Sequence, residues 1–282
     1  MKCKRLTALF ATIFFTLTLS ACSGISVNRQ ANKVDNWTHI KDRGYVVVGV
    51  DDTFVPMDFQ QKNGKLIGYD VDLANAVFKL YGIKVSFQTI DWSMNTTELR
   101  NGTIDVIWNG FSKTPAREAK VNFSKTYLDT TQVIVALKKN HINSVKDMQN
   151  KALGAQSGSS GYNDIIDYPK VLANRIKDHY PILYDSFTNA FIDLNAGRID
   201  GLLIDSSYAN YYISRQKHPE KFTEIDSSFP KEQFGVGMHK SDITLQRKIN
   251  HGLDILAKNG TLNRINRKWF GDKKAQSPLL KK

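Results

Sequence analysis

Cysteine is nearly absent from this chain: its 282 residues include only Cys3 and Cys22, both close to the start. The rest of the chain therefore offers no disulfide and no thiol for catalysis or metal binding. Long apolar runs are also missing after the first twenty residues, and none approaches the ~20 residues that a spanning helix needs. With 41 % hydrophobic residues, the remainder is expected to form one large or two medium domains stabilised by core burial.

Sequence signatures of catalysis are missing as well. The chain has no Gly-x-Ser-x-Gly elbow, no His-Glu-x-x-His and no phosphate-binding loop, and its six histidines are scattered. Residues that are distant in the sequence can still meet in the fold, so the missing motifs lower the expectation of an enzyme without removing it. We therefore expect a protein that is not an enzyme, with no metal and no cofactor.

Basic residues outnumber acidic ones, 39 to 27, which gives a formal charge of +12. A basic surface can attract nucleic acid, but here the charges are spread along the chain without a dense Lys/Arg run or an aromatic-basic motif. Lipid headgroups and cell-wall polymers are the polyanions outside the cytoplasm. The sequence predicts no nucleic-acid partner.

The first 21 residues have the composition of a signal peptide. Three basic residues near the start precede the apolar stretch Leu6–Leu19, which is too short to span a bilayer, and the small residues Ser20 and Ala21 follow it. The ending Leu-Ser-Ala-Cys resembles a bacterial lipobox, which implies that Cys22 carries a lipid and anchors the protein to the extracytoplasmic face of the cell membrane. The alternative is an ordinary signal peptide with an incidental cysteine.

The next segment, residues 22–36, is polar and without apolar periodicity, and is predicted to be a flexible tether. From Trp37 onward, strand-like and helix-like patterns alternate. Strands are predicted at Tyr45–Val50, Val85–Ile90 and Asp105–Trp108, and helices at Asp70–Tyr81 and Thr97–Asn101. This alternation predicts an α/β fold with a mostly parallel sheet covered by helices.

A second α/β series predicts a second lobe. It contains strands Ala152–Gln156 and Gly201–Ile204, with a helix at Asn189–Ala196 between them. Two β-prone stretches, Tyr127–Lys138 and Gln233–His239, are predicted to cross between the lobes and form a hinge. The predicted boundaries are residues 37–132 plus 234–271 for lobe 1, 133–233 for lobe 2 and 272–282 for a tail. The cleft between the lobes is the expected ligand site, because open α/β sheets bind ligands at the carboxyl ends of their strands.

An ordered set of short motifs resembles the extracellular solute-binding family 3 of polar amino-acid importers. The motifs, in chain order, are Gly49–Pro56, Gly68–Ala74, Asn101–Asp105, Thr114–Arg117, Phe123–Ser124, Gly197–Asp200, Asn259–Thr261 and Lys268–Gly271. Each motif alone is weak, but the ordered set is specific. The resemblance implies a two-lobed periplasmic-binding-protein-like fold of type II, a monomer, and delivery of the ligand to an ABC permease with a separate ATPase subunit.

A free amino acid carries a carboxylate and an ammonium, and a dry cleft must satisfy both charges. Arg117 matches the family's carboxylate-binding arginine, and its planar fork suits two parallel hydrogen bonds. Asp205 matches the carboxylate that binds the ammonium; it could instead be only the N-cap of a helix at Ser206–Ser214. Ser159 and Ser160 match a second carboxylate clamp.

The remaining predicted contacts also come from the resemblance. Phe54 and Trp92 match two aromatic walls, although Trp92 could instead belong to the core. The other matched ligand-binding positions are Asp51, Asn109, Gly110, Ser112 and Gln156. Family members commonly have a smaller residue at position 109, so the ligand side chain is left open among glutamine, cystine, histidine and arginine. The alternatives to import are an amino-acid sensor or adhesin and, less favoured, a dehydratase on the same fold.

Overall fold

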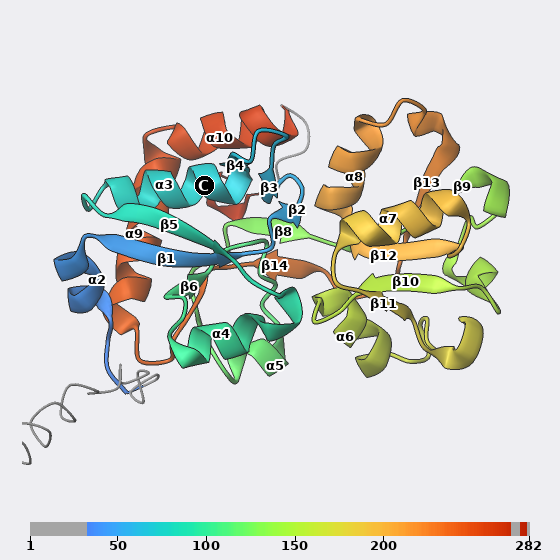
Figure 1. Ribbon diagram of the computed structural model, residues 1–282, viewed down its shortest axis with the longest axis horizontal. Coiled ribbons are helices and arrows are strands. Elements are labelled where there is room, and N and C mark those ends of the chain that lie inside the picture. The colour runs from blue at the N-terminus through green and yellow to red at the C-terminus, as the bar shows by residue number, and fades with distance from the viewer. Residues whose placement is uncertain (1–32, 272–276, 281–282) are drawn as a thin grey trace, which may run out of the picture. The chain divides into compact units, whose positions relative to one another are not determined.

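The computed structural model describes residues 33–271 and 277–280. The predicted signal peptide, Cys22 and most of the predicted tail lie outside the described residues. All described residues belong to one compact unit, which contains two five-stranded sheets, each covered by helices on both faces (Figure 1). We call the part built on the first sheet lobe 1 and the part built on the second sheet lobe 2.

The sheet of lobe 1 has the strand order β5-β1-β6-β15-β7. Its central strand β1 pairs in parallel with both β5 and β6, whereas β15 runs antiparallel to β6 and β7. The prediction of a mostly parallel sheet is therefore right: β7 runs in the same direction as β5, β1 and β6, and of the five strands only β15 runs against the others. The strands are β1 (Tyr45–Val50), β5 (Lys84–Thr89), β6 (Val106–Ile107), β7 (Asn122–Phe123) and β15 (Gly237–Met238).

Alternate side chains of β1 separate the two cores of lobe 1. Val46 and Val48 pack into the core that also contains residues of α3, α9 and α10, whereas Val47 faces the core beneath α4. This alternation follows from the two-residue period of a strand. The helices are α2 (Trp37–Arg43), α3 (Tyr69–Lys79), α4 (Asn95–Asn101), α5 (Pro115–Glu118), α9 (Ile243–Lys258) and α10 (Thr261–Phe270).

The sheet of lobe 2 repeats the arrangement with the order β11-β10-β12-β9-β13. Strand β10 pairs in parallel with β11 and β12, and β9 runs antiparallel to β12 and β13. The strands are β9 (Gln132–Leu137), β10 (Leu153–Gln156), β11 (Ile182–Tyr184), β12 (Gly201–Asp205) and β13 (Phe222–Asp226). The helices are α6 (Ser160–Asp167), α7 (Phe187–Ala196) and α8 (Ser206–Ser214).

Two short strands run between the sheets and pair with each other. Strands β8 (Leu128–Thr130) and β14 (Glu232–Phe234) form an antiparallel ladder in which Thr130 faces Glu232 and Leu128 faces Phe234. This pair corresponds to the two predicted crossovers. A small antiparallel sheet, β2 (Thr53–Phe54), β3 (Asp58–Gln60) and β4 (Leu66–Ile67), follows β1. The 3₁₀ turns are Trp92–Met94, Lys138–Asn140, Val145–Met148, Lys177–His179, Pro219–Lys221 and Pro278–Leu280.

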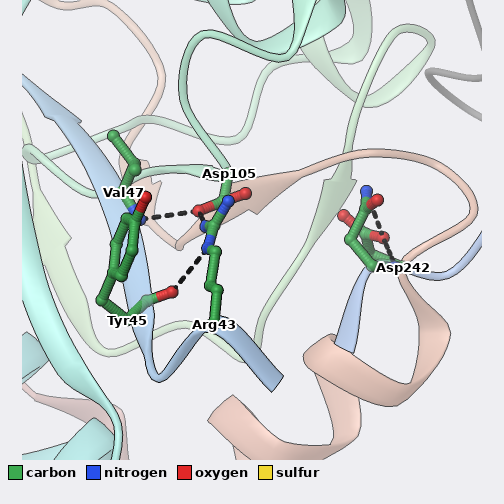
Figure 2. A network of polar contacts seen from close by, with 6 residues as sticks. Arg43, Tyr45, Val47, Asp105 and Asp242 are labelled. Carbon is green, nitrogen blue, oxygen red and sulfur yellow. Dashed lines mark hydrogen bonds and ion pairs between the residues drawn. The ribbon is translucent and has the colours of Figure 1, made fainter. Parts of the chain in front are cut away.

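A carboxylate holds the entry of β1 in place (Figure 2). Asp105 accepts a 2.6 Å hydrogen bond from the backbone N–H of Val47 and forms an ion pair with Arg43, whose Nε donates to the carbonyl of Tyr45 at 2.8 Å. Asp105 therefore joins the end of α2, the start of β1 and the loop before β6. This cross-link fixes the strands whose carboxyl ends carry the site described below.

The chain also attaches to α9 just before α2. The Oδ1 of Asp242 accepts hydrogen bonds from the backbone and side-chain nitrogens of Asn36, at 2.8 and 3.1 Å (Figure 2). Asp35 accepts from the backbone N–H of Thr244, and Ser241 donates to the carbonyl of Val34. The last three residues of the predicted tether are thus tied to the start of α9.

Candidate functional site

The candidate site is a narrow pocket lined by side chains of both lobes. Nine of the eleven residues predicted as ligand contacts line it, and the other two, Asp51 and Ser112, hydrogen-bond to lining residues directly behind them. The lining residues are Phe54, Trp92, Asn109, Gly110, Arg117, Gln156, Ser159, Ser160, Phe187 and Asp205. The structure thus gathers the whole predicted set, while the role of each residue stays a prediction.

Arg117 provides the positive charge of the pocket. It lies in the short helix α5, whose N-cap Thr114 accepts a hydrogen bond from the Arg117 backbone N–H. Its Nη1 donates to the carbonyl of Ser112 at 3.1 Å, and its Nη2 donates to the carbonyl of Gly158 in lobe 2 at 3.0 Å. The guanidinium also lies over the Phe111 ring, 4.3 Å from its centroid. Since a guanidinium has five N–H donors, groups remain that can bind a carboxylate.

Burial changes the electrostatics of Arg117. The residue is 6 % exposed, and desolvation lowers its pKa to about 10, although Glu232, Asp205 and Asp164 favour its charged form. At neutral pH the side chain therefore remains a cation in a poorly hydrated site. Such a cation attracts an anionic ligand group far more strongly than an exposed arginine does.

Asp205 provides the opposite charge from the end of β12. It is 6 % exposed, and within the described part of the chain its Oδ1 has no hydrogen-bond partner. Desolvation and then the nearby Glu232 raise its pKa well above the usual value, whereas Gln132 and Arg117 oppose that shift. Asp205 is the N-cap residue of α8, but its side chain makes no capping hydrogen bond. The alternative that it acts only as a cap therefore finds no support, and the carboxylate can accept a ligand ammonium.

A second polar contact joins the lobes at the pocket. The Nε2 of Gln156 donates a 2.6 Å hydrogen bond to Oδ2 of Asp51, and Thr53 donates to Oδ1 from both its backbone N–H and its hydroxyl. Burial raises the pKa of Asp51, and the hydrogen bonds from Thr53 and Gln156 oppose the shift. The pocket wall here is therefore the Gln156 amide, with the Asp51 carboxylate directly behind it.

Two more carboxyl groups hold the Asn109–Gly110 segment, one at each residue. Its Nδ2 donates to Asp58 at 2.6 Å, and Asp70 accepts hydrogen bonds from the backbone N–H of Gly110 and from Tyr127. Asp58 and Asp70 are fully buried, and burial raises the pKa of Asp70 to about 7 and that of Asp58 well above its usual value. Asn109, which is larger than the residue common at this position in the family, therefore has a hydrogen-bond partner in Asp58.

Aromatic side chains from both lobes close the pocket. The ring of Phe54 in lobe 1 lies 5.8 Å from that of Phe187 and 5.5 Å from that of Tyr208, both in lobe 2. Trp92 lines the pocket and also packs edge-on against Phe111 in the core of lobe 1, so its predicted wall position and its core alternative both hold.

The three serines are more constrained than the sequence indicated. Ser159 caps α6 by accepting from the Tyr162 backbone N–H at 3.0 Å. The hydroxyl of Ser112 donates to the Oε2 of Glu232, and the hydroxyl of Ser160 donates to the same oxygen at 2.8 Å. Because Ser160 uses its hydroxyl proton in this way, its backbone N–H is the donor that it can offer to a ligand carboxylate.

Sequence reasoning missed two residues of the site, Phe187 and Glu232. The predicted helix began at Asn189, although Ser186 is a typical N-cap and would have placed Phe187 in the first turn. Glu232 begins a crossover strand and is buried, and the available sequence signal was an acidic residue at the edge of the predicted crossover Gln233–His239.

In the described residues, no group of three or more His, Cys, Asp or Glu side chains is placed to hold a metal ion. The described helices include none that combines the length and apolarity needed to cross a bilayer.

A buried cation, a buried carboxylate oxygen without a hydrogen-bond partner in the described residues, and facing aromatic rings in one interlobe pocket suit a small zwitterion rather than a polymer. The fold and the pocket define the class of two-lobed solute-binding proteins. Residues 46–272 match the bacterial extracellular solute-binding proteins, family 3, and the chain belongs to this family.

Two solved structures and one relative found by sequence match this chain over most of their own length. An ABC uptake transporter substrate-binding protein from Streptococcus pneumoniae, solved with bound histidine, is 45 % identical with a TM-score of 0.84, covering 86 % of this chain and 98 % of that one. An ancestral arginine-binding protein bound to arginine is 34 % identical with a TM-score of 0.74, covering 81 % and 99 %. The L-cystine-binding protein TcyJ of Escherichia coli is 29 % identical over 236 residues, 82 % of this chain and 85 % of that protein.

Proposed function

We propose that this chain is an extracytoplasmic lipoprotein that captures a free polar amino acid and delivers it to an ABC importer. The observation that carries the proposal is the pairing of Arg117 in lobe 1 with Asp205 in lobe 2 around one pocket. Arg117 binds the ligand carboxylate and Asp205 its ammonium, so a zwitterion compensates both buried charges only when the lobes are closed. Family membership supports the transport role.

Closure around the ligand is the signal that the permease reads. The β8/β14 ladder is the hinge, since these strands connect the sheets. Contacts that exist only between the lobes, such as Arg117 with Gly158 and Gln156 with Asp51, stabilise the closed arrangement. A separate ATPase subunit supplies the energy. Lipidation of Cys22 keeps the protein at the outer face of the membrane.

The ligand has a polar side chain that is neutral or positively charged. Asp51 lies behind the Gln156 amide, and Asp58 lies behind Asn109, so an anionic side chain would lie near two carboxyl groups. The pocket therefore disfavours glutamate and aspartate. Histidine, arginine, glutamine and cystine remain the candidates.

A thermal-unfolding panel tests the proposal. The full-length chain in detergent is measured with each of the twenty amino acids and cystine. A ligand at a hundred times its dissociation constant adds about 2.7 kcal/mol of stability. A panel without any stabilising amino acid contradicts the proposal.

An uptake measurement separates import from sensing or adhesion. Cells lacking the gene should lose uptake of the radiolabelled amino acid identified by the panel, and a plasmid copy should restore it. Unchanged uptake in the deletion strain would favour a sensor or adhesin.

A further inference from the structure

Glu232 occupies a position that joins the two lobes. It begins β14, and its carboxylate is 7 % exposed beside the pocket. Its Oε2 accepts the hydroxyl of Ser112 from lobe 1 and that of Ser160 from lobe 2, and the two hydroxyl oxygens lie 3.2 Å apart. One carboxylate oxygen on the hinge thus holds a residue of each lobe.

We propose that Glu232 is a positioning residue for ligand capture, which holds the lobes closed and orients the Ser112 hydroxyl oxygen as an acceptor for the ligand ammonium. This inference rests on the proposed function. When the Ser112 hydroxyl donates its proton to Glu232, its oxygen is left as an acceptor, which can take a hydrogen bond from the Ser160 hydroxyl 3.2 Å away or from a ligand ammonium. A hydroxyl without this partner could turn its proton toward the ligand instead.

Ser112 is attached to the hinge strand β14. When the lobes open, the hydrogen bond that breaks is therefore the one between Ser160 and Glu232. The backbone of Ser112 forms an isolated bridge with Phe234, and Lys113 donates to the carbonyl of Gln233 at 2.9 Å. Ser112 therefore moves with β14. Ser160 starts α6 in lobe 2, so its bond to Glu232 forms only as lobe 2 swings onto the hinge.

The charges around Glu232 fit this role. It faces Arg117 of α5, Asp205 of β12 and Asp164 of α6. Burial and then Glu232 raise the pKa of Asp164 to about 7, and a protonated Asp164 can donate to Glu232. Charge-assisted hydrogen bonds are roughly twice as strong as neutral ones, so a carboxylate is a better acceptor for two hydroxyls than an amide is.

The test is a dissociation measurement on the full-length chain in detergent. The probe is the amino acid that stabilises the parent most in the thermal panel, and the signal is the change in intrinsic tryptophan fluorescence, to which Trp92 in the pocket contributes. We expect Glu232→Ala to weaken binding about tenfold or more, mainly through faster dissociation, and Glu232→Gln to restore part of the affinity. Glu220→Ala, an exposed acid in lobe 2, is the matched control and should stay within about twofold.

A double-mutant cycle separates positioning from general stability. Ser160→Ala should cost the parent several-fold in affinity but have little further effect in the Glu232→Gln background, because the shared bond is already weakened. If the parent binds its ligand and both Glu232 variants bind it with the parent's dissociation rate, or if the Ser160→Ala effect is the same in both backgrounds, Glu232 does not act as proposed. A parent that binds no amino acid overturns the proposed function and this inference with it.

Discussion

The side-chain amide of Gln156 in lobe 2 donates a 2.6 Å hydrogen bond to the carboxylate of Asp51 in lobe 1. This contact joins the lobes at the pocket and places an acid behind its wall, whereas Arg117 supplies a cation to the same pocket. Under the proposed function, Asp51 is therefore a candidate for setting which amino-acid side chain is preferred.

Asp51→Asn should change ligand preference rather than abolish binding. The asparagine keeps the shape but loses the charge, so affinity for arginine should fall about tenfold relative to that for glutamine. Isothermal titration with both ligands measures the ratio. Asp52→Asn is the control, because Asp52 bonds to Gln60 and Thr89 instead of the pocket. An unchanged ratio would remove Asp51 from the selectivity of the site.

Arg117→Ala should remove ligand binding while the protein still folds. Truncating one partner of a buried charge pair costs about 2–5 kcal/mol, which is at least a thirtyfold loss of affinity. Arg117→Lys should recover little, because the ammonium cannot reproduce the two-pronged contact. Titration calorimetry and far-UV circular dichroism check binding and folding. Arg100→Ala on the exposed face of α4 is the control, and parent-like affinity of Arg117→Ala would refute the carboxylate assignment.

Gly158→Ala should weaken binding by obstructing closure. An added Cβ would lie 2.7 Å from the Ser93 Cα and 3.1 Å from the Trp92 carbonyl oxygen, both in lobe 1. Gly197→Ala is a matched control, since Gly158 and Gly197 have φ of +71° and +74° but a Cβ at Gly197 meets nothing within 4 Å. Both variants should lose about 1–2 kcal/mol of unfolding free energy to backbone strain. Only Gly158→Ala should also lose affinity, about tenfold or more, in a titration.

The unliganded protein should become less stable as the pH rises from about 4 to about 7. The folded state holds a proton on Asp70 up to a pKa of about 7, whereas the unfolded chain releases it near 3.8, so the folded state binds more protons in this window. The contribution is on the order of a few kcal/mol. Urea unfolding at pH 5 and pH 8 measures it. Asp70→Asn should reduce the dependence without abolishing it, because burial also raises the pKa of other acids such as Asp58 and Asp205. Asp42→Asn, exposed on α2, should leave it unchanged, and equal slopes in all three proteins would argue against a buried proton on Asp70.

Much of the fold could be predicted from local sequence patterns. The run Tyr45–Val50 has the length and β-branched composition of a buried strand, and it is β1 to the residue. Helix α8 was also placed with its observed bounds. The reversed direction of β15 could not be predicted, because this strand is two residues long and its direction depends on where the crossover brings the chain back.

The site was predictable only where a residue type by itself suggests its chemistry. Arg117 and Asp205 carry the charges that a zwitterion needs, and the family motifs supplied their positions. The use of the Ser160 hydroxyl by Glu232 could not be predicted, since these residues are 72 positions apart and meet only because α6 and β14 converge. Phe187 was missed for a simpler reason, the late start of the predicted helix.

The hydrogen bonds of residues 34–36 to the start of α9 decide where mechanical load enters the molecule. Under the proposed lipid anchoring, a force on the segment before Val34 is transmitted first to α9 and to the sheet of lobe 1. Such a force does not act across the β8/β14 ladder, so it does not separate the two lobes.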